Sequence, residues 1–315
     1  MDKENPMNNT TIRRYIRNIL LEAPFDVAPG KNYPRTFKKF MAMVDRYKND
    51  VWVFFDTETT GLMYRQAEVQ ATEVAAVAFN MNGLTSEPSE VPDGTFHMKV
   101  ALQPDTISFM EQEPEEYEDP RKKTIAQLLV MTQYEDGPVV KSKPGDVALE
   151  FTDYINDMKA IAESQNGKVR LIAQNAVFDI GIMNVLYQRS GIPVPDDIVW
   201  DTKAVFSGYL RDTLDFIRNK SKFGPSKVDK GIIAALEREG KYGTWLSSSL
   251  GDLIKAFQIT GGENWHSAIA DVALTMKALY AAVQYLRKKG KFVQNLKTKK
   301  EFDPRGGDPY NRKKR

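Results

Sequence analysis

Runs of β-branched and aromatic residues alternate with helical stretches along most of the chain. Residues 51–55 form a continuous apolar run of Val, Trp and Phe, which is typical of a strand buried on both faces. Two further strands are predicted at residues 73–79 and 95–102, in a meander with the first. After a long segment without clear periodicity, apolar positions at helical spacing predict a helix over residues 147–161.

The pattern of the following residues places short strands between helices. Strands are predicted at 169–173 and 198–200, and a helix is predicted over 178–189. Apolar stripes also predict helices over 248–257 and 267–286. Three strands followed by strands that alternate with helices predict an α/β fold, in which helices flank a mixed central sheet.

The segments around this pattern suggest accessory parts. Residues 1–47 carry an amphipathic helix signal at 11–21 and then a turn-prone stretch, so we interpret them as an N-terminal helical extension. The main domain is predicted over 48–286, with a Pro- and acid-rich insert near 103–146. Within that insert the acidic run 111–119 predicts a solvated loop, and an electrostatic gate near the cleft is the alternative.

A second insert and a basic tail complete the predicted organisation. The lysines of residues 211–247 suggest a substrate-facing insert, with a charged surface helix pair as the alternative. Residues 287–315 carry 12 basic and 3 acidic residues, so a tail of +9 offsets a body of −7 within the total of +2. Because Phe292, Phe302 and Tyr310 lie among these basic residues, the tail suits nucleic-acid binding, and a flexible solvated tail is the alternative.

Composition limits the chemistry of the chain. Its 315 residues include no cysteine, which excludes disulfides, thiolate zinc sites, iron–sulfur clusters and a cysteine nucleophile. Two histidines exclude a three-histidine site, so any metal is expected to rest mainly on oxygen ligands. No apolar run is long enough for a membrane span and no secretory signal is visible, so we expect a cytoplasmic protein, in the host cytoplasm if phage-encoded.

A pair of carboxylates follows the first predicted strand. Asp56 and Glu58 are two residues apart, so on a strand both side chains face the same side. They lie at the carboxyl end of the strand, where α/β sheets open their ligand crevices. A solvated strand end is the alternative for this pair taken alone.

The residues that follow Asp56 and Glu58 extend the pair to a longer motif. Asp-x-Glu-Thr-Thr-Gly-Leu, over residues 56–62, resembles the first motif of the DEDDh 3′–5′ exonucleases, the DnaQ-like family of bacterial polymerase proofreading subunits. Asn-x-x-Phe-Asp at 175–179 is similar to the second motif, although Gln174 stands where the family often has histidine. His-x-Ala-x-x-Asp at 266–271 is similar to the third, and the resemblance covers about residues 49–286.

The resemblance implies an RNase-H-like fold and a set of site residues. It implies that two Mg²⁺ or Mn²⁺ ions are held by four carboxylates and that a histidine acts as general base. The ligands are Asp56, Glu58, Asp179 and Asp271, and the base is His266, all five counted as catalytic. The implied substrate-binding residues are Thr57, Thr59, Gly61, Leu62, Asn175 and Phe178.

Structural explanations exist for several of these residues. Asp179 is also explained as an acid at the N-terminus of a helix, where its charge complements the helix dipole. His266 is also explained as a histidine that caps the helix or packs in the core. Leu62, which the resemblance makes a wedge against the terminal base, suits a packed turn residue, and Phe178 suits a core aromatic. His97 lies in the third predicted strand and is assigned no catalytic part.

The implied activity is removal of 5′-mononucleotides from the 3′ ends of DNA, with single strands preferred. An exoribonuclease or oligoribonuclease with the same site is the alternative among enzymes. An inactive nucleic-acid-binding or polymerase-docking module is the alternative outside enzymes. The expected partners are nucleic acid, DNA rather than RNA, and a polymerase or another replication protein. Proofreading, repair and degradation remain open as biological roles.

Overall fold

A mixed six-stranded sheet forms the centre of the protein. The computed structural model describes residues 26–27, 37–60, 69–106, 142–195, 198–220, 224–240, 243–260 and 267–289. The strands lie in the order β1-β6-β5-β2-β3-β4. Their bounds are Asp26–Val27 for β1, Val51–Thr59 for β2, Ala71–Asn80 for β3, Ser89–Lys99 for β4, Val169–Ala173 for β5 and Ile198–Asp201 for β6.

Strand β2 lies between the antiparallel and the parallel halves of the sheet. It pairs antiparallel with β3, which pairs antiparallel with β4, so the predicted meander is confirmed. On its other side β2 pairs parallel with β5, and β5 pairs parallel with β6. Because β2 has strands on both sides and helices on both faces, its first five residues are all buried, as its continuous apolar run predicts.

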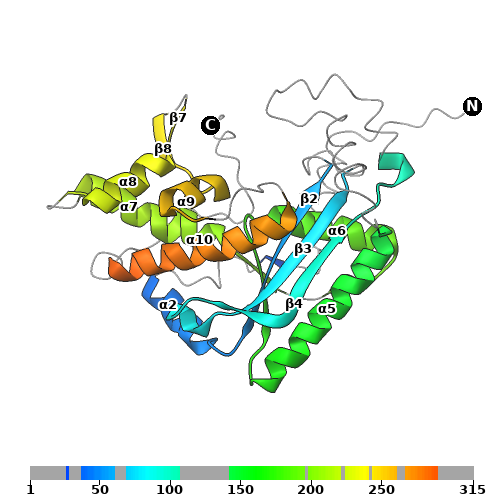
Figure 1. The fold of residues 1–315 in the computed structure, drawn as a ribbon. Helices are drawn as coiled ribbons and strands as arrows, with labels where there is room; N and C mark the ends of the chain where they lie inside the picture. The colour runs from blue at the N-terminus through cyan, green and yellow to red at the C-terminus, as the bar shows by residue number, and fades with distance from the viewer. Residues whose placement is uncertain are drawn as a thin grey trace, which may run out of the picture.

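Helices cover both faces of the sheet. Helix α10 (Ala268–Lys288) lies across one face, and helices α5 (Pro144–Ser164) and α6 (Val177–Ser190) lie on the other (Figure 1). Side chains of β2 alternate between the two cores, since Trp52 and Phe54 pack on the α10 side and Val53 packs on the α5 and α6 side. This mixed α/β arrangement is the one expected of an RNase-H-like fold.

Shorter elements surround α10 and the sheet edge. The segment predicted as the second insert forms two helices and a two-stranded hairpin, which lie together with α9 beside α10 (Figure 1). The elements are α2 (Phe37–Arg46), η2 (Asn82–Leu84), the π-helical η4 (Ala204–Leu210), α7 (Arg211–Lys220), α8 (Lys227–Leu236), β7 (Glu237–Gly240), β8 (Gly243–Leu246) and α9 (Leu250–Phe257). Within the described ranges, no helix has both the length and the hydropathy of a membrane span.

Two elements in the N-terminal part were not predicted. Residues 26–27 fall in a stretch interpreted as turn-prone, yet they pair in parallel with β6 and extend the sheet. Helix α2 buries Phe37, Phe40 and Val44, whose spacing of three and four residues forms one apolar face. The predicted helix at 11–21 lies outside the described residues, as does most of the insert at 103–146.

Several boundaries also differ from the prediction, most of all that of β4, which begins at Ser89 and not at residue 95. Strand β2 continues to Thr59, so Asp56 and Glu58 lie within the strand and not after it. Helix α10 continues to Lys288, two residues into the segment predicted as the tail. The extensions of β2 and α10 follow from pairing and packing. Strand β2 remains paired with β3 as far as Thr59, and Leu286, near the end of α10, is fully buried.

Candidate active site

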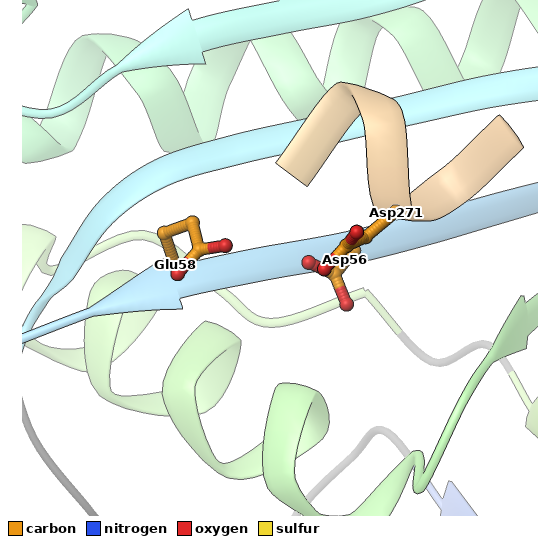
Figure 2. A group of neighbouring side chains, drawn as sticks. All are labelled: Asp56, Glu58 and Asp271. Carbon is orange, nitrogen blue, oxygen red and sulfur yellow. The ribbon is translucent and has the colours of Figure 1, made fainter. Parts of the chain in front are cut away.

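Three carboxylates meet where β2 passes beneath the first turn of α10. Asp56 and Glu58 are two residues apart on β2 and therefore share the face that α10 covers. Asp271 lies in the first turn of α10 and points toward them (Figure 2). One carboxylate oxygen of each residue lies within 4.8 Å of one oxygen of both others. The cluster thus joins acids from the first and the third sequence motif.

The start of α10 is fixed by its sequence and by the sheet. Ser267 is the N-cap residue, and its hydroxyl accepts from the Ala270 N–H at 3.4 Å. The backbone N–H of Ala268, the first residue of α10, donates to the Glu73 carboxylate on β3 at 3.1 Å. Asp271 is therefore held on a helix turn that is anchored both locally and across to the sheet.

Asp179 reaches β2 from helix α6, on the other side of the strand. Its Oδ1 accepts hydrogen bonds from the backbone N–H of Thr57 at 3.0 Å and from the Thr57 hydroxyl at 2.8 Å. Asp179 does not belong to the group of three whose ligand atoms lie within 4.8 Å. It is still close enough to Asp56 to raise the pKa of that carboxyl. The structure thus brings the fourth acid to the strand but bonds it to Thr57.

The crowding of acids perturbs their ionisation. Burial raises the pKa of Asp56 well above its usual value, and the charges of Asp179, Asp271, Glu58 and Glu73 raise it further. Burial also raises the pKa of Asp179 to about 7, although its hydrogen bonds from Thr57 act in the opposite direction. Carboxylates that repel each other in this way are stabilised by a cation between them. The oxygen-only, half-buried cluster can therefore hold a divalent metal ion such as Mg²⁺ or Mn²⁺.

The raised pKa values predict how the metal-free protein responds to pH. Between the ordinary pKa of 3.8 and the raised value of about 7, folded Asp179 keeps a proton that the unfolded chain has lost. The free energy of unfolding therefore falls as pH rises through this range. In EDTA, we expect the melting temperature to fall between about pH 5 and about pH 7.5, as measured by calorimetry.

The variant Asp56→Asn tests the origin of this effect. Because it removes one of the repelling charges, we expect it to melt a few degrees higher than the wild type in EDTA at about pH 7.5. Addition of Mg²⁺ should raise the melting temperature of the wild type more than that of the variant. A variant that melts lower than the wild type in EDTA would show that Asp56 is not under electrostatic stress.

The loop of the second motif is held by Asp201 at the end of β6. The Asp201 carboxylate accepts from the backbone N–H of Asn175 at 3.1 Å and from that of Lys203 at 2.8 Å. Asn175 has φ of 61°, a left-handed conformation that asparagine tolerates well. Its side-chain oxygen accepts from the Lys203 ammonium at 3.0 Å. The loop before α6 is therefore held by contacts to Asp201, the last residue of β6, and to Lys203, two residues further along the chain.

Gln174, which stands where the DEDDh exonucleases often have histidine, has a structural role in the same loop. Its amide nitrogen donates to the Ser248 carbonyl at 2.9 Å, and its amide oxygen accepts from the Thr202 hydroxyl. These two bonds connect the second motif to β6 and to the segment before α9. Both polar atoms of the Gln174 side chain are therefore hydrogen-bonded within the protein.

The remaining predicted site residues fall into two groups. Thr59 is half-buried at the end of β2, opposite Ala71, and Phe178 is half-buried against the α5 and α6 core. Gly61, Leu62 and His266 lie outside the described residues, so their roles stay predictions. Thr57 and Asn175, predicted to bind substrate, are bonded to Asp179 and to Lys203 within the protein.

Sequence reasoning missed two residues beside the cluster, Glu73 and His97. Glu73 lies opposite Glu58 in the pairing of β2 and β3, and its carboxylate bonds both His97 and α10. The available signal is that Glu73 is a charged residue near the start of a strand that is otherwise almost entirely apolar and buried. Asp201, which accepts from the backbone of Asn175 and of Lys203, is a further residue that positions the second motif.

Comparison with known proteins gives two partial similarities. No protein-family model matches the chain. A segment of 117 residues, 37% of the chain, is 32% identical to a DNA polymerase III of PolC type from Lactococcus lactis subsp. lactis (strain IL1403). A segment of 163 residues, 51% of the chain, is 27% identical to a DNA polymerase III of PolC type from Streptococcus suis (strain 98HAH33). These segments span 5% and 9% of the two polymerases, so the chain is similar to a small part of each.

Proposed function

We propose that this protein is a divalent-metal-dependent 3′–5′ exonuclease that removes 5′-mononucleotides from DNA, with single-stranded 3′ ends preferred. The observation that carries the proposal is the meeting of Asp56, Glu58 and Asp271, which come from separate motifs, in one cluster. The order of the motifs supports an exonuclease, and the similarity to part of two bacterial DNA polymerases supports a coarse nuclease role with DNA as the polymer.

The donor set fits the metal that the resemblance implies. Asp56, Glu58 and Asp271 would hold Mg²⁺ or Mn²⁺, because hard cations prefer carboxylate oxygens and the cluster carries excess negative charge. Asp179 is the fourth candidate ligand and lies on the opposite side of β2, oriented by Thr57. When bound, two such ions would stabilise the charge that develops on the water oxygen that attacks the phosphorus and on the 3′ oxygen that leaves it.

Proton transfer in the proposed reaction is assigned to a residue of the protein. In the proposed reaction His266 accepts a proton from a water molecule, whose oxygen forms a bond to the terminal phosphorus. The bond between that phosphorus and the 3′ oxygen of the preceding nucleotide breaks, and this oxygen takes up a proton. The products are a 5′-mononucleotide and a strand that ends in a 3′ hydroxyl group.

The domain organisation is part of the same proposal. Residues 48–286 would form the catalytic domain, with inserts near 103–146 and 211–247. The +9 tail from residue 287 onward would contact the backbone of the nucleic acid, and residues 1–47 would form an accessory extension.

A direct assay tests the proposed activity and its substrate. The protein is incubated with 5′-labelled single-stranded DNA, duplex DNA and RNA, each with Mg²⁺ or with EDTA. We expect a ladder of products that shorten stepwise from the 3′ end, fastest for single-stranded DNA, only in the presence of Mg²⁺. Mass spectrometry should identify 5′-mononucleotides as the released product.

Other outcomes of this assay have defined meanings. Degradation of RNA alone would replace the proposal with an exoribonuclease. Release of the 5′ label in one step, or shortening that persists in EDTA, would contradict it. Binding of DNA without any shortening would indicate the inactive nucleic-acid-binding module.

A further inference from the structure

Glu73 is a buried carboxylate with two hydrogen bonds on a single oxygen. Its side chain lies on β3 and the residue is only 8% exposed. Its Oε1 accepts from the backbone N–H of Ala268, the first residue of α10, at 3.1 Å. The same oxygen lies 2.8 Å from Nε2 of His97 on β4. Because an ionised carboxylate has no hydrogen to give, His97 donates in this bond.

The pairing of the strands explains how these residues meet. Glu73 lies opposite Glu58 in the register of β2 and β3, and His97 lies opposite Ala75 in the register of β3 and β4. Glu73 and His97 are thus diagonal neighbours on the face of the sheet that carries the cluster. The bond between Glu73 and Ala268 then connects this face to the first turn of α10.

An acid at this position needs an explanation, because it adds a charge beside an acidic cluster. Glu73 is one of the four carboxylates that raise the pKa of Asp56. Its contact with the N-terminus of α10 and its bond from His97 offset part of that repulsion. Ser267 already caps the helix, so the contribution specific to Glu73 is a connection between β3 and α10.

We propose that Glu73 and His97 form a positioning pair that sets the distance between Asp271 and the carboxylates of β2. Ala268, which Glu73 holds, lies three residues before Asp271 on the first turn of α10. His97 keeps the Glu73 carboxylate turned toward the helix. The inference rests on the proposed function in that the metal cluster is the site whose geometry the pair controls.

The pair is tested with variants that separate position from charge. Glu73→Ala removes the acceptor for Ala268, whereas Glu73→Gln keeps an amide oxygen that can accept from Ala268 and His97. His97→Ala removes the donor, and His97→Gln keeps an amide donor. Glu90→Ala is the matched control, because Glu90 is an exposed acid on β4 that bonds Thr95.

The first readout is binding of Mn²⁺ without substrate, followed by electron paramagnetic resonance. We expect Glu73→Ala to weaken binding by about 10- to 100-fold, the range typical of residues that orient metal ligands. His97→Ala should weaken it by a smaller factor. Glu73→Gln, His97→Gln and Glu90→Ala should each stay within about threefold of the wild type, because the acceptor or donor is retained or the site is not touched.

The second readout is the metal requirement of the exonuclease. In Glu73→Ala, the Mn²⁺ concentration for half-maximal rate should rise in parallel with the loss of binding, while the KM for DNA stays unchanged. A purely structural role would lower the melting temperature in EDTA without changing either metal readout, and this result would overturn the inference. Equal losses in Glu73→Gln and Glu73→Ala would overturn it too, because charge and not position would then be decisive.

The two proposals fail in different ways. If the wild type degrades no nucleic acid but Mn²⁺ binding responds to Glu73→Ala as expected, the proposed function fails and the positioning pair stands. If the wild type degrades DNA and Glu73→Ala keeps the wild-type metal affinity, the positioning pair fails and the function stands. Should Glu73→Ala not fold, the two His97 variants decide the same question.

Discussion

Replacement of Asp56 by alanine is expected to lower kcat/KM on single-stranded DNA by about 10³-fold or more, since metal ions supply several kcal/mol of transition-state stabilisation and each 1.36 kcal/mol is worth tenfold. Asp56 is the acid whose pKa responds to all its acidic neighbours, Asp179, Asp271, Glu58 and Glu73. A cation bound in the cluster therefore depends on this side chain more than on an acid at its edge. The measurement is the initial rate on a 5′-labelled strand at saturating Mg²⁺.

Two controls separate the loss of chemistry from the loss of fold. Asp56→Asn keeps the size of the side chain and should be equally inactive, with a higher melting temperature in EDTA at about pH 7.5. Asp157→Asn removes an exposed acid from α5, on the opposite side of the sheet, and should keep the wild-type rate. Activity of Asp56→Ala within about tenfold of the wild type would show that the cluster is not the metal site.

The second large effect is expected at His266. Loss of a general base costs about 10²- to 10⁴-fold in rate, so His266→Ala should be nearly inactive at any metal concentration. Its affinity for Mn²⁺ should equal that of the wild type, because His266 is predicted to act on water and not on the metal. The wild-type rate should rise with pH as the general base loses its proton, and the variant should lose this rise.

The other histidine provides the matched comparison. His97→Ala should need more Mn²⁺ for half-maximal rate but should recover at excess metal, because His97 acts through Glu73 and the start of α10. His266→Ala should not recover under the same conditions. Recovery of His266→Ala by metal alone would contradict its assignment as the base.

Much of the fold follows from local patterns. The apolar run of β2 predicts its burial, and α5, β5, α6, β6, α9 and α10 lie close to their predicted bounds. No bounds were predicted for the helices and the hairpin between β6 and α9. Helix α2 was overlooked although its apolar positions have helical spacing, and β1 is too short for any pattern to indicate. Its two residues become a strand only because β6 offers them a parallel partner.

The site was predictable only in part, because its geometry depends on pairing across the chain. The spacing of Asp56 and Glu58 predicts a shared face, but Asp271 joins them through the packing of α10 on the sheet. Glu73 and His97 meet through the register of β3 and β4, which shifts between Val77 and Phe79, and no local pattern encodes that register. His97 was therefore assigned no part, although the structure bonds it to the residue that holds α10.

Asp179 shows a different reason for incomplete prediction. The motif places it at the start of a helix, and the structure confirms that position in the first turn of α6. Its partner, Thr57, lies between Asp56 and Glu58 on β2 and faces the other side of the strand, toward α6. The sequence names both residues but does not show that the acid bonds the threonine.

The most direct test of the metal centre is a crystal structure of the protein soaked with Mn²⁺ and a 5′-mononucleotide, with diffraction data collected to locate manganese by its anomalous signal. We expect anomalous peaks between the carboxylates of Asp56, Glu58 and Asp271, with the phosphate of the nucleotide beside them. Asp56→Asn crystals should lose the signal. A wild-type crystal without manganese at these three residues, or with manganese bound only elsewhere, would contradict the metal-dependent mechanism.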